Sequence, residues 1–564
     1  TWMGSGGGLD YSSGQTFWLI DQATGEKVYE GKTTLSKSAD EADDFLGRNH
    51  SDTDVFLMDF SDFNRAGQYS VYVDGVGTSY DFEIGENTWR DAFYVSARGM
   101  YHQRSGIELE QPYTDYERPR AFHPEDGVKI YQSTVALMDT NMGLNGQVDV
   151  FEALNAGRTD EIVTDAWGGW MDAGDWDRRI QHLDVSRSFL ELVEIHGSYF
   201  DSVDLDIPES GNNLPDILDE ALWGLDVFRR LQTEAGGIPG GIESGGHPVM
   251  FEASWQESQD IMVYAPGIWS SFFYAGVAAR AAYVLADYDP QLAQTYQESA
   301  LRAMNWANDE LAKDPEGRYG AIYDQQNLAA AELYRLTGDT QWNDLFLETT
   351  VFSDPGKSVY VWQQHDQANA AYVYGSTNRP GVDSTVQQNA LNAMVRQAEY
   401  EVNNIQRTGF KWNADPWAPI GWGSLGAPDT DILLRTHALT GDADYLNASL
   451  LASQFSAGAN PDNMVYTTGI GHRNPNIPEL ADARALGEVP SGITVYGPLD
   501  LQNPNGYGED WRWSVELFAN ATGPNPWEWP TAEAYFDSYH YVPVTEFTIS
   551  QSIGPTAYTW GYLA

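Results

Sequence analysis

Cysteine is absent from all 564 positions of the sequence. This absence excludes disulfide bonds, thiolate zinc sites and cysteine nucleophiles. It does not indicate a cellular compartment, because a chain of this length can bury a large core without covalent cross-links. Runs of about 18 consecutive apolar residues are also missing, so the sequence predicts no membrane-spanning helix.

Basic residues are scarce. The sequence has 31 Lys and Arg against 82 Asp and Glu, which gives a net charge of −51. Such a surface repels phosphate backbones and anionic lipid, so we expect neither nucleic acid nor a membrane as a partner. A neutral substrate would not be repelled. An initiator Met is missing as well, and we interpret Thr1 as a processed or trimmed start.

The N-terminal part of the chain has the alternation that is typical of half-buried strands. Tyr69, Val71 and Val73 occupy alternate positions, and the segment 80–84 repeats the pattern. Gly-containing turns separate these short runs. The pattern predicts a small β-sandwich, although the spacing does not distinguish a sandwich from a small barrel.

From about Asp91 onward the apolar residues follow helical spacing. Long helices are predicted at 91–101, 214–232, 270–285 and 388–403. Between the helices lie long loops rich in Gly, Pro and aromatic residues. Because long ordered loops on a rigid scaffold usually carry function, we expect binding residues in them. The loops are 236–268, 408–430 and 456–545.

A helix–stop–helix pattern recurs along the helical part. It is clear at 331–342 and 436–445, and a looser copy stands at 282–290. Each copy contains a helix, a Gly or Pro stop, and an Asp suited to capping the next helix. Repeated helical hairpins predict a toroid of paired helices.

Carboxylates cluster in Gly-Gly-Trp-Met-Asp-Ala-Gly-Asp-Trp-Asp-Arg-Arg at 168–179. Asp172, Asp175 and Asp177 raise one another's pKa if they lie together, so their coexistence needs a reason. One reason is general acid/base chemistry on a sugar between aromatic walls. The other is a turn and capping segment at the start of a helix, and the spacing alone favours this second interpretation.

Four segments follow one another along the chain in an order that can be compared with known families. They are Gly-Gly-Trp-Met-Asp-Ala-Gly-Asp at 168–175, Leu-Pro-Asp-Ile-Leu-Asp-Glu-Ala at 214–221, Ser-Ala-Gly-Ala-Asn-Pro-Asp at 456–462 and Thr-Glu-Phe-Thr-Ile at 545–549. Together they resemble glycoside hydrolase family 9, and Asp-Phe-Ser at 59–61 resembles the immunoglobulin-like module that precedes many members. The resemblance implies a mainly α fold. An (α/α)6-barrel catalytic domain at 89–564 would follow an immunoglobulin-like β-sandwich at 1–88.

The resemblance also assigns catalytic roles by position. Asp175 would be the general base that activates water, Asp172 would hold the same water, and Glu546 would be the general acid. Inversion needs room for water, roughly 6.5–9.5 Å between the acid and base carboxyls. Two loops far apart in the sequence can be set at such a distance. Without the family, Glu546 would be interpreted as a surface residue capping the last helix.

The chain departs from the family pattern near the sugar-binding segments. Thr545 replaces the usual Asn before the acid, and Pro478 is followed by Glu479 and Leu480 instead of a His-His-Arg run. His472 and Arg473 lie just upstream, and we predict that they reach the same subsite. A zinc site built from Cys and His, as in some members, is excluded because cysteine is absent. The catalytic residues are thus retained while the subsites differ.

Aromatic residues in the polar loops suit a neutral polysaccharide, because pyranose rings stack on indole faces. We predict that Trp417, Trp422 and Tyr539 contact sugar, and that about half of the other loop aromatics only fix their loops to the barrel. The β module shows no exposed row of Trp, so we expect it to pack against the barrel without binding substrate. The other loop aromatics are Trp255, Trp412, Trp511, Trp513, Trp527, Trp529 and Tyr535.

The sequence therefore predicts an inverting endo-β-1,4-glucanase that acts on cellulose or mixed-linkage glucan. An exo-acting relative that releases glucosyl or glucosaminyl units is an alternative, since the altered segment near Pro478 and the insertion at 505–545 could close one end of the cleft. A non-catalytic carbohydrate-binding protein is less favoured because all three carboxylates are retained. A polysaccharide lyase would want a Tyr or His base near Arg, which these motifs do not supply.

No cofactor is required for this chemistry. Structural calcium is possible from the Asp-rich stretches 201–206 and 429–444, with no metal ligand assigned. A β-glucan polysaccharide is the expected partner, and we expect a secreted, extracellular monomer.

Overall fold

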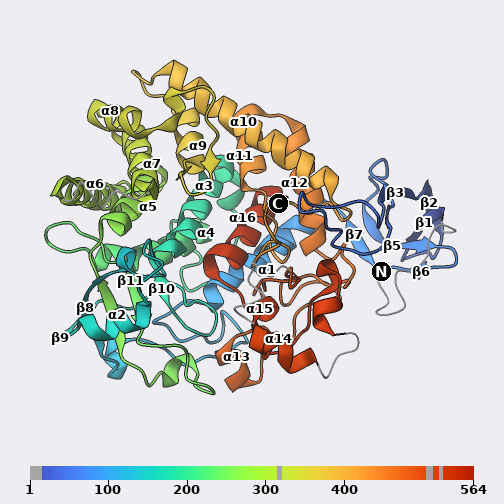
Figure 1. Cartoon of the computed structure of the whole chain (residues 1–564), viewed down its shortest axis with the longest axis horizontal. Helices are drawn as coiled ribbons and strands as arrows, with labels where there is room; N and C mark the ends of the chain where they lie inside the picture. The colour runs from blue at the N-terminus through green and yellow to red at the C-terminus, as the bar shows by residue number, and fades with distance from the viewer. Residues whose placement is uncertain (1–14, 314–319, 503–511, 520–524) are drawn as a thin grey trace.

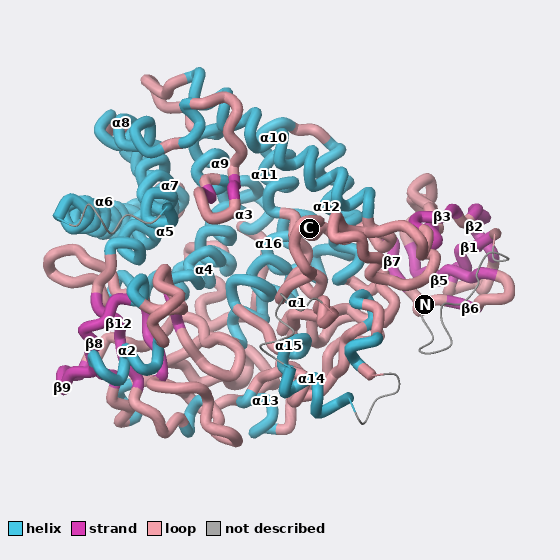
Figure 2. The backbone as a smooth tube through the Cα atoms, in the orientation of Figure 1, coloured by secondary structure: helices cyan, strands magenta, loops and turns pink. Residues whose placement is uncertain are grey.

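A computed structural model describes residues 15–313, 320–502, 512–519 and 525–564. A small β domain at the N-terminal side lies beside a much larger helical domain (Figure 1). In Figure 2 most of the strands form two separate groups, one in the small domain and one at the far side of the helical domain, and a short pair lies near α9. The structure confirms the predicted mainly α fold with a small β domain in front of it.

The N-terminal domain is built from antiparallel strands. Alternation along β1 turns Phe17 and Leu19 into the core, where both are fully buried. The larger sheet has the order β2-β1-β5-β6, with β7 also paired to β5, and β3 pairs with β4. The strands are β1 (Thr16–Asp21), β2 (Lys27–Lys32), β3 (Thr34–Lys37), β4 (Val55–Leu57), β5 (Gly67–Val73), β6 (Gly77–Thr78) and β7 (Phe82–Ile84).

The helical domain is a closed ring of helical hairpins. Each inner helix packs against the next one, and the last packs against the first. The inner helices are α3 (Leu183–Phe200), α5 (Ile268–Leu285), α7 (Gly320–Thr337), α9 (Ala368–Ser376), α11 (Asp431–Thr440) and α16 (Gly554–Leu563). Their outer partners are α4 (Asp216–Arg230), α6 (Pro290–Lys313), α8 (Thr340–Thr349), α10 (Ser384–Arg407), α12 (Ala443–Ser456) and α1 (Thr88–His102). This arrangement is the predicted (α/α)6 barrel.

The stop signals in the sequence make these hairpins. Gly441 ends α11 with a φ of 71°, a left-handed conformation that glycine adopts without strain. Asp442 then caps α12 by accepting the Asp444 N–H. Asp339 caps α8 in the same way by accepting the Gln341 N–H. Local chemistry therefore fixes where each hairpin turns.

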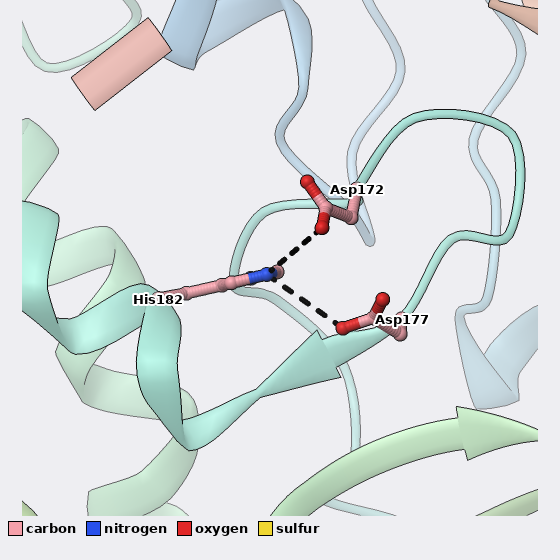
Figure 3. A group of neighbouring side chains, drawn as sticks. All are labelled: Asp172, Asp177 and His182. Carbon is pink, nitrogen blue, oxygen red and sulfur yellow. Dashed lines mark ion pairs between the residues drawn. The ribbon is translucent and has the colours of Figure 1, made fainter. Parts of the chain in front are cut away.

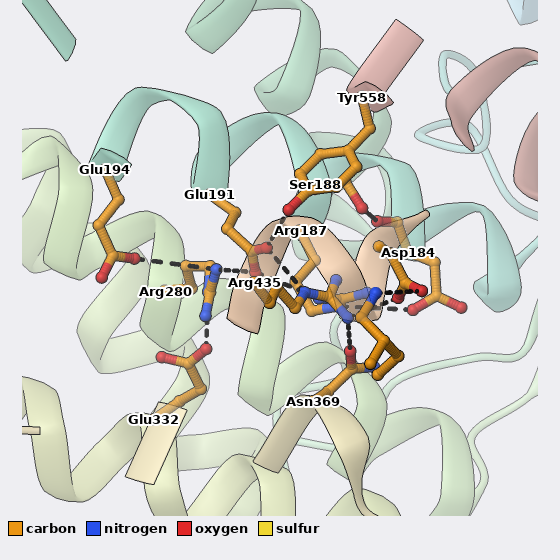
Figure 4. Close-up of polar contacts among 12 residues, drawn as sticks. Asp184, Arg187, Ser188, Glu191, Glu194, Arg280, Glu332, Asn369, Arg435 and Tyr558 are labelled. Carbon is orange, nitrogen blue, oxygen red and sulfur yellow. Dashed lines mark hydrogen bonds and ion pairs between the residues drawn. The ribbon is translucent and has the colours of Figure 1, made fainter. Parts of the chain in front are cut away.

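Charged side chains are buried inside the ring. Glu191 of α3 is fully buried, and its carboxylate accepts hydrogen bonds from Arg280 at 2.8 Å, Arg435 at 2.8 Å and the Tyr558 hydroxyl at 2.6 Å (Figure 4). The three partners belong to α5, α11 and α16. The network thus joins four inner helices at the barrel interior.

A five-stranded sheet stands on one side of the barrel, and the sequence analysis did not predict it. The segment 236–268 was expected to be a loop, but it contains two of these strands, so that expectation was wrong. The strands pair in the order β10-β11-β12-β8-β9, and β12 and β8 are parallel. They are β8 (Ile130–Ala136), β9 (Arg158–Ile162), β10 (Arg178–Arg179), β11 (Gly241–Ser244) and β12 (Ile261–Ala265), and α2 (Val150–Gly157) lies between β8 and β9.

The β domain packs against the barrel, as predicted. Arg48 forms an ion pair with buried Asp500. The Gly409 N–H donates to Asp43 Oδ1 at 3.1 Å, and the Ser36 hydroxyl donates to the Gly409 carbonyl at 2.8 Å. In the described ranges no helix has the length and apolar character needed to cross a membrane. The remaining short elements are β13 (Tyr360–Val361), β14 (His365–Asp366), α13 (Ala481–Leu486), α14 (Arg512–Ala519) and α15 (Val542–Thr545).

Candidate active site

The loop that carries the clustered carboxylates is anchored on both sides. The Trp170 indole is fully buried and donates to Glu220 at 2.7 Å, and the Met171 N–H donates to the Gln103 carbonyl at 2.8 Å. The Asp172 N–H donates to the Asp177 carbonyl at 3.2 Å, which closes the loop on itself. The three carboxylates predicted from the sequence are therefore held together in one tight turn before β10.

Asp172 is also bound to the C-terminal part of the chain. Its Oδ1 accepts the Ile549 N–H at 2.7 Å, and the residue is buried. Ile549 lies three residues after Glu546, and Glu546 itself comes directly after α15. The structure thus brings the candidate acid and the clustered carboxylates to the same end of the barrel.

The Glu546 carboxyl is half-buried in acidic surroundings. Desolvation and the negative charges of Asp172, Glu479 and Asp177 raise its pKa to about 8. Its carbonyl accepts the Tyr496 N–H at 2.7 Å, which fixes the backbone at this point. A carboxyl with such a pKa carries a proton at neutral pH, as a general acid must.

Asp175 differs in its surroundings. Desolvation and the charge of Asp177 raise its pKa well above the usual value, and Arg179 opposes this shift. The side chain is half-buried and accepts no hydrogen bond from the described residues. Its oxygens are therefore available to a water molecule or a substrate hydroxyl.

The sequence assigns no role to Asp177 and gives no sign of the charged groups around it. Asp177 is buried, and its Oδ2 lies 3.2 Å from Arg179 Nη1. Arg179 Nε donates to Glu243 of β11 at 2.7 Å, and Tyr264 of β12 donates to the same carboxylate at 2.8 Å. The unpredicted sheet thus supplies the partners of these charges, which is why no local pattern revealed them.

Asp172, Asp177 and His182 form a buried group that could hold a metal ion (Figure 3). His182 Nε2 lies 3.7 Å from Asp172 and 3.6 Å from Asp177, while Nδ1 lies 3.2 Å from the Trp170 carbonyl. Burial lowers the His182 pKa, but the two carboxylates outweigh it and raise the pKa overall. A set of carboxylate and imidazole ligands suits zinc or a similar transition metal better than calcium.

Several carboxylates of the Asp-rich stretches 201–206 and 429–444 have protein partners. Asp201 accepts the Tyr288 hydroxyl at 2.9 Å, and Asp206 accepts the Tyr94 hydroxyl at 2.5 Å. Asp442 caps α12, and Asp431 pairs with Arg435 at 2.6 Å. Calcium binding by these stretches stays a prediction.

A pocket of about 410 Å³ opens at the N-terminal ends of α3, α9, α11 and α16. The Trp422 side chain lies on its wall and stacks on Tyr496, with ring centroids 5.9 Å apart and planes 5° apart. Tyr496 is the residue that binds the Glu546 carbonyl, so the pocket adjoins the candidate acid. Its polar lining includes Asp184, Arg187, Asp366, Asn369, Asp429, Asp431 and Gln551.

The other residues predicted to contact sugar lie elsewhere around the site. Trp417 is exposed and packs against Phe45 of the β domain in a tilted arrangement, with 4.5 Å between ring centroids. His472 pairs with Asp81 of that domain at 2.9 Å. Arg473 donates to the Asp462 carbonyl at 2.8 Å. Of this set the structure brings Trp422 to the pocket, and sugar binding by every member of the set stays a prediction.

Tyr539 and Glu479 both contact Arg484. Glu479 is one of the residues that depart from the family pattern after Pro478. The Arg484 guanidinium carbon lies 5.0 Å from the Tyr539 ring centroid and Arg484 also pairs with Glu479 at 3.8 Å. The Glu479 N–H donates to the Thr545 carbonyl at 2.8 Å, next to Glu546. Desolvation raises the pKa of Glu479 to about 7. Trp511, named among the loop aromatics, falls outside the described residues.

Comparison with known proteins agrees with this geometry. The profile of glycosyl hydrolase family 9 matches residues 89–554, and that of the cellulase N-terminal ig-like domain matches residues 9–78. Endoglucanase D of Acetivibrio thermocellus is 25% identical over 488 residues, which cover 82% of this chain and 70% of that protein. Endoglucanase C of Cellulomonas fimi is 28% identical over 461 residues, which cover 74% of this chain and 39% of that protein.

Solved structures show the same fold. The structure of a family 9 endoglucanase named J30 superimposes with a TM-score of 0.79 at 22% identity, covering 99% of this chain and 97% of that one. The helical ring and its acidic centre thus define a glycoside hydrolase. The chain belongs to glycosyl hydrolase family 9, and it carries the immunoglobulin-like domain that precedes the catalytic domain in cellulases. Enzymes of this family hydrolyse cellulose and related β-glucans with inversion and need no cofactor for the chemistry.

Proposed function

We propose that this protein is an endo-β-1,4-glucanase that cleaves cellulose or mixed-linkage β-glucan inside the chain. The observation that supports it best is the Asp172–Ile549 hydrogen bond, because it ties the loop of the base to the segment of the acid. Both curated relatives described above are named endoglucanases. The acidic surface and the aromatic residues around the pocket suit an uncharged polysaccharide.

In the proposed mechanism Glu546 donates its proton to the glycosidic oxygen as the bond to the anomeric carbon breaks. Asp175 takes a proton from a water molecule that attacks the same carbon from the opposite face. Asp172, fixed by Ile549, orients this water. One water molecule is consumed, and the new reducing end forms in the α configuration. The raised pKa of Glu546 supports its role as the acid.

The substrate also bears on where the enzyme works. Because a polymeric glucan does not enter cells, we propose an extracellular, secreted enzyme that acts as a monomer. Fractionation of the native host culture, followed by immunoblotting, tests the first part, and enzyme confined to the cell interior would refute it. Sedimentation equilibrium tests the second, and a dimer at working concentration would refute it.

The experiment that tests the activity compares two readouts on soluble cellulose. Endo cleavage lowers the viscosity of carboxymethylcellulose quickly while few reducing ends appear, and aryl β-glucosides stay intact. Fast aryl release with stable viscosity would instead show exo action. NMR of the first product from a cello-oligosaccharide should show the α-anomer.

The catalytic roles are tested by substitution. Asp175→Ala and Glu546→Ala should each lower kcat by about 10²–10⁴-fold, the usual contribution of a general acid or base. Asp160→Ala, at a fully exposed carboxylate on β9, serves as the matched control and should retain activity. Near-normal activity of either variant would refute the role assigned to that residue.

A further inference from the structure

A ring of the β domain stands beside one of the loop tryptophans. The centroids of Phe45 and Trp417 are 4.5 Å apart with planes inclined by 47°, yet Phe45 is 43% exposed and Trp417 is 66% exposed. The Phe45 N–H donates to the Pro416 carbonyl at 2.8 Å, and the Arg407 guanidinium carbon lies 4.2 Å from the Phe45 ring centroid. The two rings are therefore held in place while much of their surface stays in solvent.

The segment that carries Trp417 leads to the pocket, because Trp422 of the same loop lines it. Desolvation raises the pKa of Asp429, which lines the pocket, and the charges of Asp431 and Asp415 raise it further. Desolvation and the charges of Asp366 and Asp415 raise the pKa of Tyr360, and Asp366 is another residue that lines the pocket. The charge of Asp415 thus acts on groups of the pocket and its surroundings, and its side chain accepts the Trp417 N–H at 3.0 Å.

Two aromatic residues of the β13–β14 hairpin, in which Asp366 lines the pocket, are exposed as well. Tyr360 is exposed, and Trp362 in the turn between β13 and β14 is more exposed still. Exposed apolar groups that gather beside a binding site commonly mark a ligand surface. Trp422, on the pocket wall, follows Trp417 on the same loop, so this loop connects the exposed Trp417 ring with the candidate active site.

We propose that Phe45 and Trp417 form a distal platform for the β-glucan chain as it leaves the pocket, so that the N-terminal domain takes part in substrate binding. The proposal rests on the proposed function. Pyranose rings present apolar C–H faces that stack on aromatic rings, and Phe45 and Trp417 lose little conformational entropy on binding because their rings are already held in place. It revises the expectation from the sequence that the β domain only packs against the barrel.

Docking of the two domains alone does not account for Phe45. The interface is already held by the Arg48–Asp500 ion pair and by the bond from Gly409 to Asp43. A ring needed only for docking would be buried in that interface, whereas nearly half of Phe45 faces solvent. The geometry of Phe45 suits a ligand that covers it.

The test compares a short with a long substrate in the full-length enzyme. We expect Phe45→Ala to raise KM for mixed-linkage β-glucan polymer about two- to tenfold, the effect of losing one aromatic contact. Hydrolysis of cellotetraose should keep its kcat and KM, because so short a chain bound at the acid does not reach the platform. Phe45→Tyr should restore the KM for the polymer. Leu35→Ala, at a 55% exposed residue of the same domain, is the control and should change neither substrate.

Three outcomes decide the matter. Selective loss on the polymer, with rescue by Tyr, supports the platform. Equal changes on both substrates, or a lower melting temperature with unchanged kinetics, would overturn it and leave Phe45 as a structural contact. Failure of the unaltered enzyme to hydrolyse either substrate would refute the proposed function itself, which distinguishes that failure from failure of the platform.

Discussion

The backbone N–H of Ile549 donates a hydrogen bond of 2.7 Å to Asp172 Oδ1, although the two residues are 377 positions apart. This bond joins the loop of the base to the segment of the acid at the open end of the barrel. Because the acid and the base of an inverting enzyme must keep a fixed separation, the bond has a mechanical as well as a chemical role. The two roles can be separated by substitution.

Asp172→Asn keeps an Oδ1 acceptor for the Ile549 N–H but removes the negative charge, whereas Asp172→Ala removes both. We expect both variants to lose at least about tenfold in kcat, since the charge that orients water is gone. Only the Ala variant should lose about 1–3 kcal/mol of stability, the cost of leaving a buried donor without a partner. Urea unfolding and steady-state kinetics measure the two effects. An Asn variant with full activity would contradict the assigned role of Asp172.

The pH dependence of kcat/KM follows from the two raised pKa values. Glu546 must be protonated, so activity should fall as pH rises through about 8. Asp175 must be ionised, so the acidic limb should lie above the usual carboxylate range. Asp177→Asn removes the largest nearby charge that raises the pKa of Asp175, so the acidic limb should move to lower pH. An acidic limb that stays in place or moves upward would show that Asp175 is not the group observed.

Much of the fold could be predicted because its causes are local. The Gly441 stop, the Asp442 cap and the alternation along 69–73 each act within a few residues, and the helices and strands appear where these signals stand. The sheet around β11 could not be predicted in this way. Its strands are short, and the pairing of β8 with β12 joins Ile130 to Ile261, so no local period reveals it.

The same distinction between local and long-range causes holds for the candidate site. Asp172, Asp175 and Glu546 could be selected only because ordered motifs resemble a family, since their spacing alone favoured a turn and a surface cap. The surroundings of these carboxylates depend on long-range closure. His182 faces Asp172 only after the loop turns back, and His472 pairs with Asp81 of the other domain. Such contacts leave no signal in a single sequence.

Glu191→Gln should destabilise the barrel strongly. Burial alone would raise the Glu191 pKa, but Arg435, Arg280 and Arg187 hold it at about 2. Because the pKa is lowered in the folded state, the stabilisation is fully present above about pH 4.5 and is lost as pH falls toward about 2. Removing the charge takes a shared buried carboxylate from three guanidinium groups, although Arg280 keeps its pair with Glu332 and Arg435 keeps its pair with Asp431. Breaking a buried ion pair of this kind costs about 3–5 kcal/mol.

Two controls accompany this variant in chemical unfolding at several pH values. Glu310→Gln breaks a surface pair with Lys313 and should cost less than about 1 kcal/mol. The unaltered protein should lose stability between pH 4.5 and 2 more steeply than Glu191→Gln does. Equal slopes for the two proteins would contradict the lowered pKa of Glu191.

Metal removal should have no effect on hydrolysis, whereas zinc addition should slow it. Dialysis against EDTA should leave the rate of hydrolysis unchanged, because acid/base chemistry needs no metal. Added Zn²⁺ should inhibit, because an ion held by Asp172, Asp177 and His182 occupies the carboxylate that orients water. His182→Ala should be less sensitive to Zn²⁺ than the unaltered enzyme, while a variant at exposed His247 should not differ. Identical inhibition curves for all three proteins would place the zinc effect elsewhere.

The interface between the β domain and the barrel depends on ion pairs of Arg48. Arg48 pairs with Asp500 across the interface and with Asp44 at 2.9 Å in its own domain, and Asp500 is buried. In Arg48→Ala the Asp500 carboxylate keeps its burial but loses its counterion, so we expect a loss of about 1–3 kcal/mol and a lower melting temperature. Arg65→Ala removes an exposed guanidinium that pairs with Asp21 within the β domain, and it should change the melting temperature little. Because Arg48 does not touch the catalytic carboxylates, kcat on cellotetraose should stay the same in both variants. If Arg48→Ala melted like the unaltered protein, the interface would depend on the backbone bonds at Gly409 instead, and Asp43→Ala would then be the variant that separates the domains.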